Sequence, residues 1–309
     1  MCSRYRHNHK EGESQPSKVH CLDRFSETDY CRLMVNQLVM ALELYRQALR
    51  KTWQSLLRGW LIIVAVVAFL FLLLIAQQIA APLGMAGGFL LGAVNALLVG
   101  MTLSLIEQSV SYARSITIKD IFDSFGHYFW DVIGVGFVLW IPLMALDLAT
   151  QQNPNGQLIS FAVMLLLFIL LNPAPEIIYQ VPHDSPLDVF KRAYDFVLEN
   201  WIEWFLPIAL LLVPLVAAPG GLMSFFLLSH RVGRGAGLDF SQILVVPFAI
   251  LGSWLSSLGI DPELAQLLVL LLTPPLGVSI LLFRGHLFAS LFRSSHRQRQ
   301  FAAQSKGND

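Results

Sequence analysis

The sequence predicts an all-α integral membrane protein in which six transmembrane helices form three hairpins, each preceded by an amphipathic interfacial helix. Composition is the first reason: of 309 residues, 55% are hydrophobic and 14% are charged, whereas soluble domains carry about 25% charged residues. Apolar runs of about 20 residues, the length that crosses a bilayer, recur along the chain. The Lys and Arg residues, moreover, gather in alternate loops and at both ends, which is typical of multi-pass membrane proteins.

The chain opens with a polar segment. Residues 1–28 lack apolar periodicity, so we expect a disordered cytoplasmic tail. All three cysteines lie near this end, in a compartment that keeps thiols reduced, and we expect no disulfide. The Cys and His residues here have no zinc-ligand spacing, so no metal site is predicted. The change in composition before Met34 leaves two starts of translation open, Met1 and Met34.

Residues 29–292 form the predicted helical membrane domain. Between Leu38 and Trp60, apolar residues recur every three or four positions with basic residues on the other faces, which predicts the first amphipathic helix. The six spans that follow are predominantly apolar runs bounded by Pro, Gly, Asn or charged residues, at about 60–79, 83–106, 132–149, 158–179, 201–229 and 264–283. Prolines interrupt the fifth, which is the least regular. Residues 238–260 remain open as a seventh span, a re-entrant segment or an interfacial helix. Residues 293–309 form a basic cytoplasmic tail.

Amphipathic stretches also precede spans three and five. The first runs from Ile118 to Val132, and the second begins after Ser185, a residue suited to cap a helix. The two stretches share a spacing of hydroxyl, acid and phenylalanine: Thr117, Asp120 and Phe122 match Ser185, Asp188 and Phe190. The match is either an internal repeat or the common occurrence of interfacial helices in membrane proteins.

The distribution of basic residues orients the predicted spans. With six spans, nineteen of the 21 Lys and Arg residues fall on one side of the membrane, and only Arg231 and Arg234 fall on the other. A seventh span would move the five C-terminal basic residues across and weaken this asymmetry. Because cytoplasmic loops carry the excess of Lys and Arg, we expect six spans with both termini in the cytoplasm.

Two segments near the end of span four carry a resemblance. They read NPAPEIIY, rich in proline, and SPLDVFKRAYDFVLENW, an amphipathic pattern. With the plan of hairpins, over about residues 30–295, the chain resembles the bacterial six-span membrane domain fused to some glycerophosphodiester phosphodiesterases, and its uncharacterised stand-alone relatives. The resemblance implies a bacterial inner-membrane location. That family has no established catalytic residues in its membrane part, so none is carried over.

Small residues recur every fourth position along span two. They are Gly84, Gly88, Gly92, Ala96, Gly100 and Ser104. Such a stripe lets two helix backbones approach closely and substitutes for the hydrophobic drive that is missing between helices in lipid. The partner is a helix of the same bundle or, alternatively, a second copy of the chain in a homodimer.

Four carboxylates lie within or beside predicted spans: Glu107, Asp147, Glu176 and Glu203. Each is close to a span end, so we expect water or headgroups to solvate it and predict no buried charge pair. The candidate transport site is the cluster of Asn172, Pro173, Pro175 and Glu176. Prolines leave backbone carbonyls without partners there, as in the broken helices of transporters.

The sequence lacks the motifs of phosphate-binding loops, serine hydrolases and zinc peptidases, so neither enzyme activity nor a cofactor is predicted. The leading hypothesis is a non-enzymatic inner-membrane scaffold or accessory factor for a lipid or membrane-protein partner. The alternative is a small-solute or lipid transporter that uses the break at Asn172–Glu176. The basic ends indicate contacts with anionic lipid rather than nucleic acid.

Overall fold

The computed structural model describes residues 27–112, 114–150, 156–217 and 258–293, together with residues 252 and 255. These residues form helices and turns, without a strand. The chain divides into two units, Met1–Leu42 and Glu43–Asp309, and the packing described below is that of the second unit. The predicted tails lie almost entirely outside the described residues, as does most of segment 238–260.

Within the described residues, five segments are long and apolar enough to cross a membrane. They are Leu61–Leu83, Met85–Ser111, Phe129–Thr150, Ala162–Gln180 and Glu263–Phe292. Five of the six predicted spans coincide with these segments. The prediction of an all-helical chain with apolar helices of membrane-spanning length is confirmed for these five. The remaining prediction, 201–229, is described only to residue 217.

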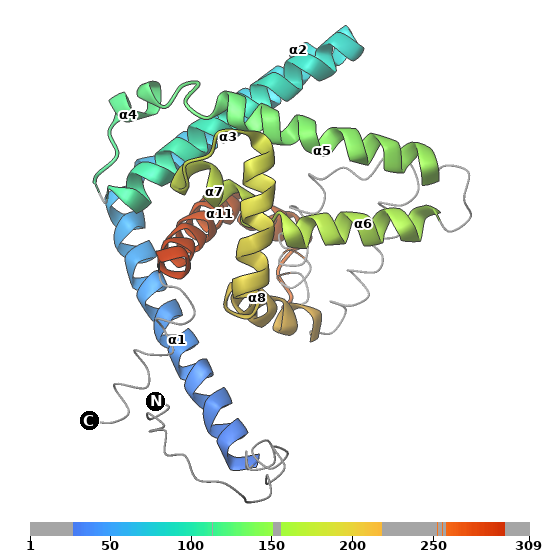
Figure 1. Cartoon of the computed structure of the whole chain (residues 1–309). Helices are drawn as coiled ribbons and strands as arrows, with labels where there is room; N and C mark the ends of the chain where they lie inside the picture. The colour runs from blue at the N-terminus through green and yellow to red at the C-terminus, as the bar shows by residue number, and fades with distance from the viewer. Residues whose placement is uncertain are drawn as a thin grey trace, which may run out of the picture. The chain divides into compact units, whose positions relative to one another are not determined.

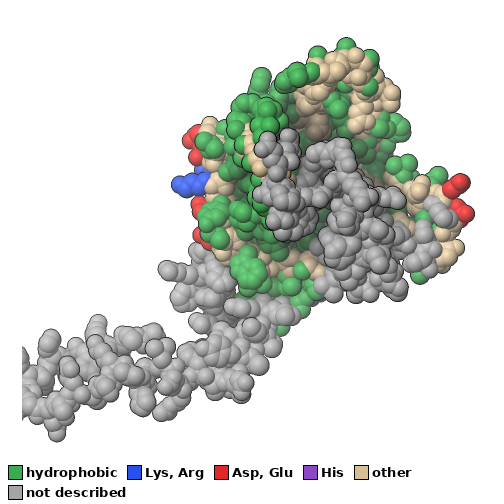
Figure 2. Space-filling model, turned by 90° about the vertical axis from the view of Figure 1, so that its right-hand side faces the viewer, with side chains coloured by type: hydrophobic (Ala, Val, Ile, Leu, Met, Phe, Trp, Pro, Cys, Tyr) green, Lys and Arg blue, Asp and Glu red, His purple; other side chains and the backbone are tan. Residues whose placement is uncertain are grey.

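The helices follow one another in a simple order. They are α1 (Glu27–Arg58), α2 (Leu61–Ala80) with the short η1 (Ala81–Leu83), α3 (Met85–Ser111), α4 (Ile118–Asp123), α5 (Phe129–Thr150), α6 (Gly156–Leu170), α7 (Ala174–Gln180), α8 (Pro186–Ala217) and α11 (Pro262–Arg293). On the face drawn in Figure 2, hydrophobic side chains cover much of the described surface. Large side chains of α2 such as Phe71 and Leu74 are exposed, as expected where lipid is the solvent.

Helix α3 lies at the centre of this packing. It contacts α2, α5, α7 and α11 (Figure 1). Its buried side chains gather in its second half, from Ala96 onward. A Cβ atom on Gly100 would lie only 3.1 Å from the backbone carbon of Tyr128 and 3.2 Å from the nitrogen of Phe129. The absence of a side chain at Gly100 therefore allows α3 and the start of α5 to approach closely.

The predicted amphipathic helix from Ile118 to Val132 is wrong as a continuous element. Helix α4 has six residues, a turn follows, and α5 already begins at Phe129. Gly126 has a φ of 76° in this turn, a left-handed conformation that glycine adopts without strain. The apolar periodicity continues through the turn, which is why the pattern predicted one helix instead of two.

Both predicted helix starts are capped alike. The Thr117 amide donates to the Asp120 carboxylate at 2.8 Å, and the Asp120 amide donates back to the Thr117 hydroxyl at 3.4 Å. The Ser185 amide donates to Asp188 at 3.1 Å, and the Asp188 amide donates to the Ser185 hydroxyl at 3.3 Å. These reciprocal bonds satisfy amides that have no partner inside the helix. The predicted cap at Ser185 is confirmed.

Candidate functional site at the break in span four

The predicted span four is interrupted between α6 and α7. Helix α6 ends at Leu170, and α7 begins at Ala174 after Pro173, its N-cap residue. Pro175 follows in the first turn of α7, where its missing N–H leaves no helical hydrogen bond unmade. The break sets Glu176 in the first turn of α7, where the positive end of the helix dipole favours a negative charge.

Glu176 is buried, with 1% of its surface exposed, and it is paired with Arg284 of α11. The Arg284 Nε donates to Glu176 Oε1 at 2.8 Å, and Nη2 donates to Oε2 at 2.9 Å. The same Nη2 donates to the backbone carbonyl of Asn172 at the break. This two-pronged geometry is the strong form of a carboxylate–guanidinium contact. The pair joins α7 to α11.

Trp204 of α8 completes the site. Its indole Nε1 donates to the Asn172 side-chain oxygen at 2.9 Å. The Arg284 guanidinium carbon lies 5.2 Å from the centre of the Trp204 ring, within the range of a cation–π interaction. Phe196 and Phe288 pack beside it, with ring centres 4.6 Å apart. These apolar surroundings strengthen the attraction between the charges because they lower the local dielectric constant.

Next to the ion pair, α7 and α11 approach each other at Gly285. A Cβ atom on Gly285 would lie 2.5 Å from the Tyr179 hydroxyl oxygen and 3.0 Å from Val110. Gln180 Nε2 donates to the Gly285 carbonyl at 3.0 Å. The Tyr179 hydroxyl is buried and has no hydrogen-bond partner among the described residues. The absence of a side chain at Gly285 therefore leaves room for the Tyr179 and Val110 side chains where α7 and α11 approach.

Two hydrogen bonds, one buried and one partly buried, connect the second half of α1 to the same region. The Ser55 hydroxyl lies 3.0 Å from His286 Nε2, and the Tyr45 hydroxyl donates to the Glu203 carbonyl at 2.9 Å. The buried side chains of α1 include Tyr45, Ala48 and Ser55, whereas Trp53 is exposed. In the second unit, therefore, α1 turns its smaller and polar side chains toward the protein and large apolar ones outward.

The prediction that water or headgroups solvate the carboxylates is wrong for Glu176. The prediction of no buried charge pair is wrong for the same reason, because Glu176 is buried and paired with Arg284. The predicted last span ended at residue 283 and left Arg284 beyond it, but α11 continues to Arg293. The signal in the sequence was Arg284 itself, a single charge within LLFRGHLFASLF. Glu107 is half-buried and accepts a hydrogen bond from the Tyr128 hydroxyl at 2.8 Å. The side chain of Asp147 lies outside the described residues.

The stripe of small residues on α3 divides into two halves. Ala96, Gly100 and Ser104 are buried against other helices, whereas Gly88 and Gly92 are exposed. The exposed set also includes Gly84, where the helix begins. A side chain at Gly88 or Gly92 would meet no atom within 4 Å. The buried half packs against other helices of the same chain. The exposed half could face a second copy of the chain, so the homodimer stays a prediction.

Comparison of the chain with protein-family models, curated proteins and solved structures finds no match. Function therefore has to follow from the site. Its chemistry is that of a neutralised ion pair: both oxygens of Glu176 accept hydrogen bonds from Arg284. Among the described residues, no group of three or more His, Cys, Asp or Glu side chains could hold a metal ion.

Proposed function

We propose that the chain is a six-span protein of a bacterial inner membrane, with three hairpins, an interfacial helix before each, and both ends in the cytoplasm. Five apolar helices support this plan, and α8 continues from Trp201 to Ala217 where span five is predicted. The backbone of α8 kinks at Asn200, where φ is −130°, between the predicted interfacial helix and that span. With Arg284 inside the bundle, the basic residues remain concentrated on one side.

We further propose that the protein is a non-enzymatic scaffold or accessory factor for a lipid or another membrane protein. The observation that carries this proposal is the pairing of Glu176 with Arg284. A carboxylate that couples transport must bind and release a proton or an ion, whereas both oxygens of Glu176 are held by one guanidinium. The resemblance to a membrane domain without catalytic residues agrees with this role.

A transporter is the second candidate, and the break between α6 and α7 favours it. The Asn172 carbonyl accepts its hydrogen bond from a side chain, Arg284, as happens where transporter helices are broken. In that mechanism the ion pair is a gate that opens when substrate replaces one partner. The two candidates make opposite statements about Glu176: it is a structural partner in the first and a coupling group in the second.

The test uses purified full-length protein in lipid vesicles and in detergent. Proton flux is followed with a pH-sensitive dye inside the vesicles, and phospholipid flux with fluorescent phosphatidylethanolamine quenched from outside. The scaffold predicts no flux above empty vesicles and a lower melting temperature for Glu176→Gln. The transporter predicts flux in the unmodified protein that is lost in Glu176→Gln or Pro173→Ala while expression stays intact. Glu199→Gln, an exposed carboxylate of α8, is the matched control.

A further inference from the structure

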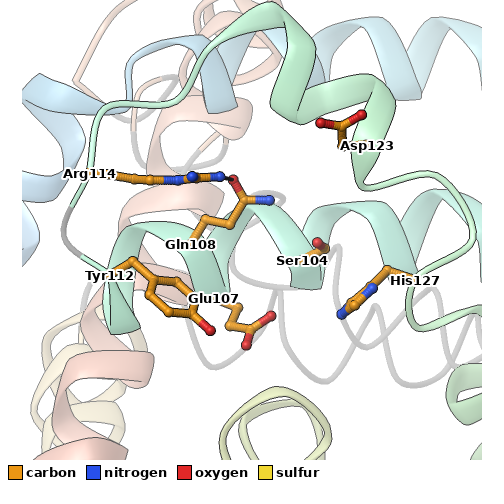
Figure 3. A pocket seen from close by; sticks show the side chains of 7 residues that line it. All are labelled: Ser104, Glu107, Gln108, Tyr112, Arg114, Asp123 and His127. Atoms are coloured by element: carbon orange, nitrogen blue, oxygen red, sulfur yellow. Dashed lines mark hydrogen bonds between the residues drawn. The ribbon is translucent and has the colours of Figure 1, made fainter.

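A cavity of about 330 Å³ lies between the end of α3 and the segment from Arg114 to His127. Each residue that lines it carries a polar group, and the residues come from both sides of the α3–α4 connection: Ser104, Glu107, Gln108, Tyr112, Arg114, Asp123 and His127 (Figure 3). The volume is in the range of about 300–1,000 Å³ in which small-molecule sites fall. In Figure 3 the Glu107 carboxylate and the His127 ring extend toward the same space. The cavity is separate from the Glu176–Arg284 pair.

Of the charged side chains around the cavity, Arg114 has an acidic partner, whereas Glu107 and Asp123 have no basic partner among the described residues. Arg114 donates to Asp120 at 2.6 Å and to Gln108 at 2.9 Å through one nitrogen, Nη2. Neither Glu107 nor Asp123 has a basic side chain within ion-pair distance in the part of the chain that the structure describes. Among the described residues, the cavity thus offers two carboxylates without a cationic partner, and an arginine whose Nε and Nη1 groups have no hydrogen-bond partner. Such a site complements a ligand that carries both a cation and an anion.

Tyr128 holds Glu107 in place as an acceptor. Its hydroxyl donates to Glu107 Oε2 at 2.8 Å. Burial, together with this hydrogen bond and the nearby negative charge, raises the pKa of Tyr128 above its ordinary value. The Tyr128 hydroxyl therefore stays protonated and continues to donate its hydrogen bond to Glu107 Oε2. The other carboxylate oxygen of Glu107 can accept a hydrogen bond from a ligand N–H.

The surroundings of the cavity are those of a lipid interface. Ile118, Phe122 and Phe125 are all at least 64% exposed beside it. A row of large apolar side chains next to a polar cavity, at the end of an apolar helix, matches the boundary between acyl chains and headgroups. A ligand with a polar head and apolar tails fits both parts at once.

We propose that this cavity binds the headgroup of an aminophospholipid, with its primary ammonium against Glu107 and Asp123 and its phosphate beside Arg114. The inference rests on the proposed role as a lipid-associated scaffold and names the lipid class. The same phosphoethanolamine group occurs in soluble glycerophosphoethanolamine. The lipid differs from this soluble compound in its acyl chains, and the test below uses that difference. A primary ammonium donates N–H groups to the carboxylates, whereas the trimethylammonium of choline lipids has none to donate.

Native mass spectrometry of the full-length protein tests this proposal. Lipids of identical acyl chains are added as phosphatidylethanolamine, phosphatidylcholine or phosphatidylglycerol, and bound adducts are counted. We expect phosphatidylethanolamine to bind about tenfold more tightly than either other lipid, the size of one charge-assisted hydrogen bond. Glu107→Gln removes the preference. Asp123→Asn, at an exposed position, reduces it about threefold and remains informative if Glu107→Gln fails to fold. Glu199→Gln leaves it unchanged.

Equal binding of the three lipids, or a preference that survives Asp123→Asn and Glu107→Gln, would overturn the proposal. Displacement of the lipid by millimolar glycerophosphoethanolamine would assign the site to the free headgroup, and failure of displacement would assign it to the intact lipid. The result is independent of the flux experiment. If no lipid preference and no flux are found, the lipid site is rejected and the scaffold proposal stands. If flux depends on Glu176 and the lipid preference is present, the scaffold proposal is rejected and the lipid site stands.

Discussion

Arg284 makes four contacts with a single side chain. Its guanidinium donates to both oxygens of Glu176 and to the Asn172 carbonyl, and it lies over the Trp204 ring. A charged side chain inside a membrane is costly unless it is paired. Lysine has one nitrogen and cannot reproduce the planar fork that reaches both oxygens. The identity of the residue, and not only its charge, therefore matters at position 284.

Breaking this pair should destabilise the membrane domain. Glu176→Gln and Arg284→Gln each leave one buried charge without its partner, and we expect each to lower the free energy of unfolding by about 3–5 kcal/mol. The double variant leaves no unpaired charge, so it should lose clearly less than the sum of the two. Thermal unfolding in detergent, compared across the four proteins, measures the coupling. Additive losses would show that the two side chains do not interact.

The Asp120 carboxylate gives a pH-dependent element at the start of α4. Hydrogen bonding from Thr117, with Arg114 nearby, holds the pKa of Asp120 below its ordinary value of 3.8. Because the pKa is lower in the folded protein, the cap contributes its full stability above pH 3.8 and loses it as the pH falls through the lowered pKa. A carbon NMR titration should give a midpoint below 3.8, and Thr117→Ala should raise it. An unchanged midpoint in Thr117→Ala would remove the hydroxyl as the cause.

At the scale of elements, α3 has two different halves. Its second half packs closely at Gly100, and its first half is open at Gly92. Gly100→Leu drives a side chain into the backbone at Tyr128 and Phe129, so we expect it to destabilise the protein by about 1–3 kcal/mol or more. Gly92→Leu should leave the melting temperature of the monomer unchanged. Equal tolerance of both substitutions would contradict the close approach of α3 and α5.

The same pair of variants tests the homodimer prediction. If the exposed residues Gly88 and Gly92 form an interface between two copies, Gly92→Leu weakens self-association, measured by cross-linking in membranes, without a change in monomer stability. Gly100→Leu affects stability first. Self-association that is unaffected by Gly92→Leu would assign the whole stripe to packing within one chain.

The elements were predictable where their signals are local. Apolar length gave five of the spans, and the Ser185 to Asp188 spacing gave the start of α8, because capping involves residues three apart. The turn at Gly126 was missed because the periodicity of apolar side chains does not indicate where the backbone adopts a left-handed conformation. The pairing of Glu176 with Arg284 was missed because its partners are 108 residues apart. Nothing near either residue specifies which distant charge it meets.

At the scale of the whole molecule, the proposed topology makes a direct prediction. Reporter fusions should place the C-terminus in the cytoplasm and the connection around Asn155 outside, because six spans keep nearly all basic residues on the cytoplasmic side. Fusions within α4 should also be cytoplasmic. A C-terminus outside the cytoplasm would contradict six spans and would require segment 238–260 to cross the membrane.

The 108 residues between Glu176 and Arg284 also set an order of assembly during synthesis. A ribosome adds about 5–20 residues per second, so α7 is made roughly 5–20 s before the arginine that neutralises it. During this interval the membrane domain lacks the helix that completes it, and the carboxylate needs another neighbour. We expect nascent chains stalled before Arg284 to remain cross-linked to the insertion machinery, and chains stalled well beyond Arg293 to be released. The last helix would then be the step that commits the protein to its folded state.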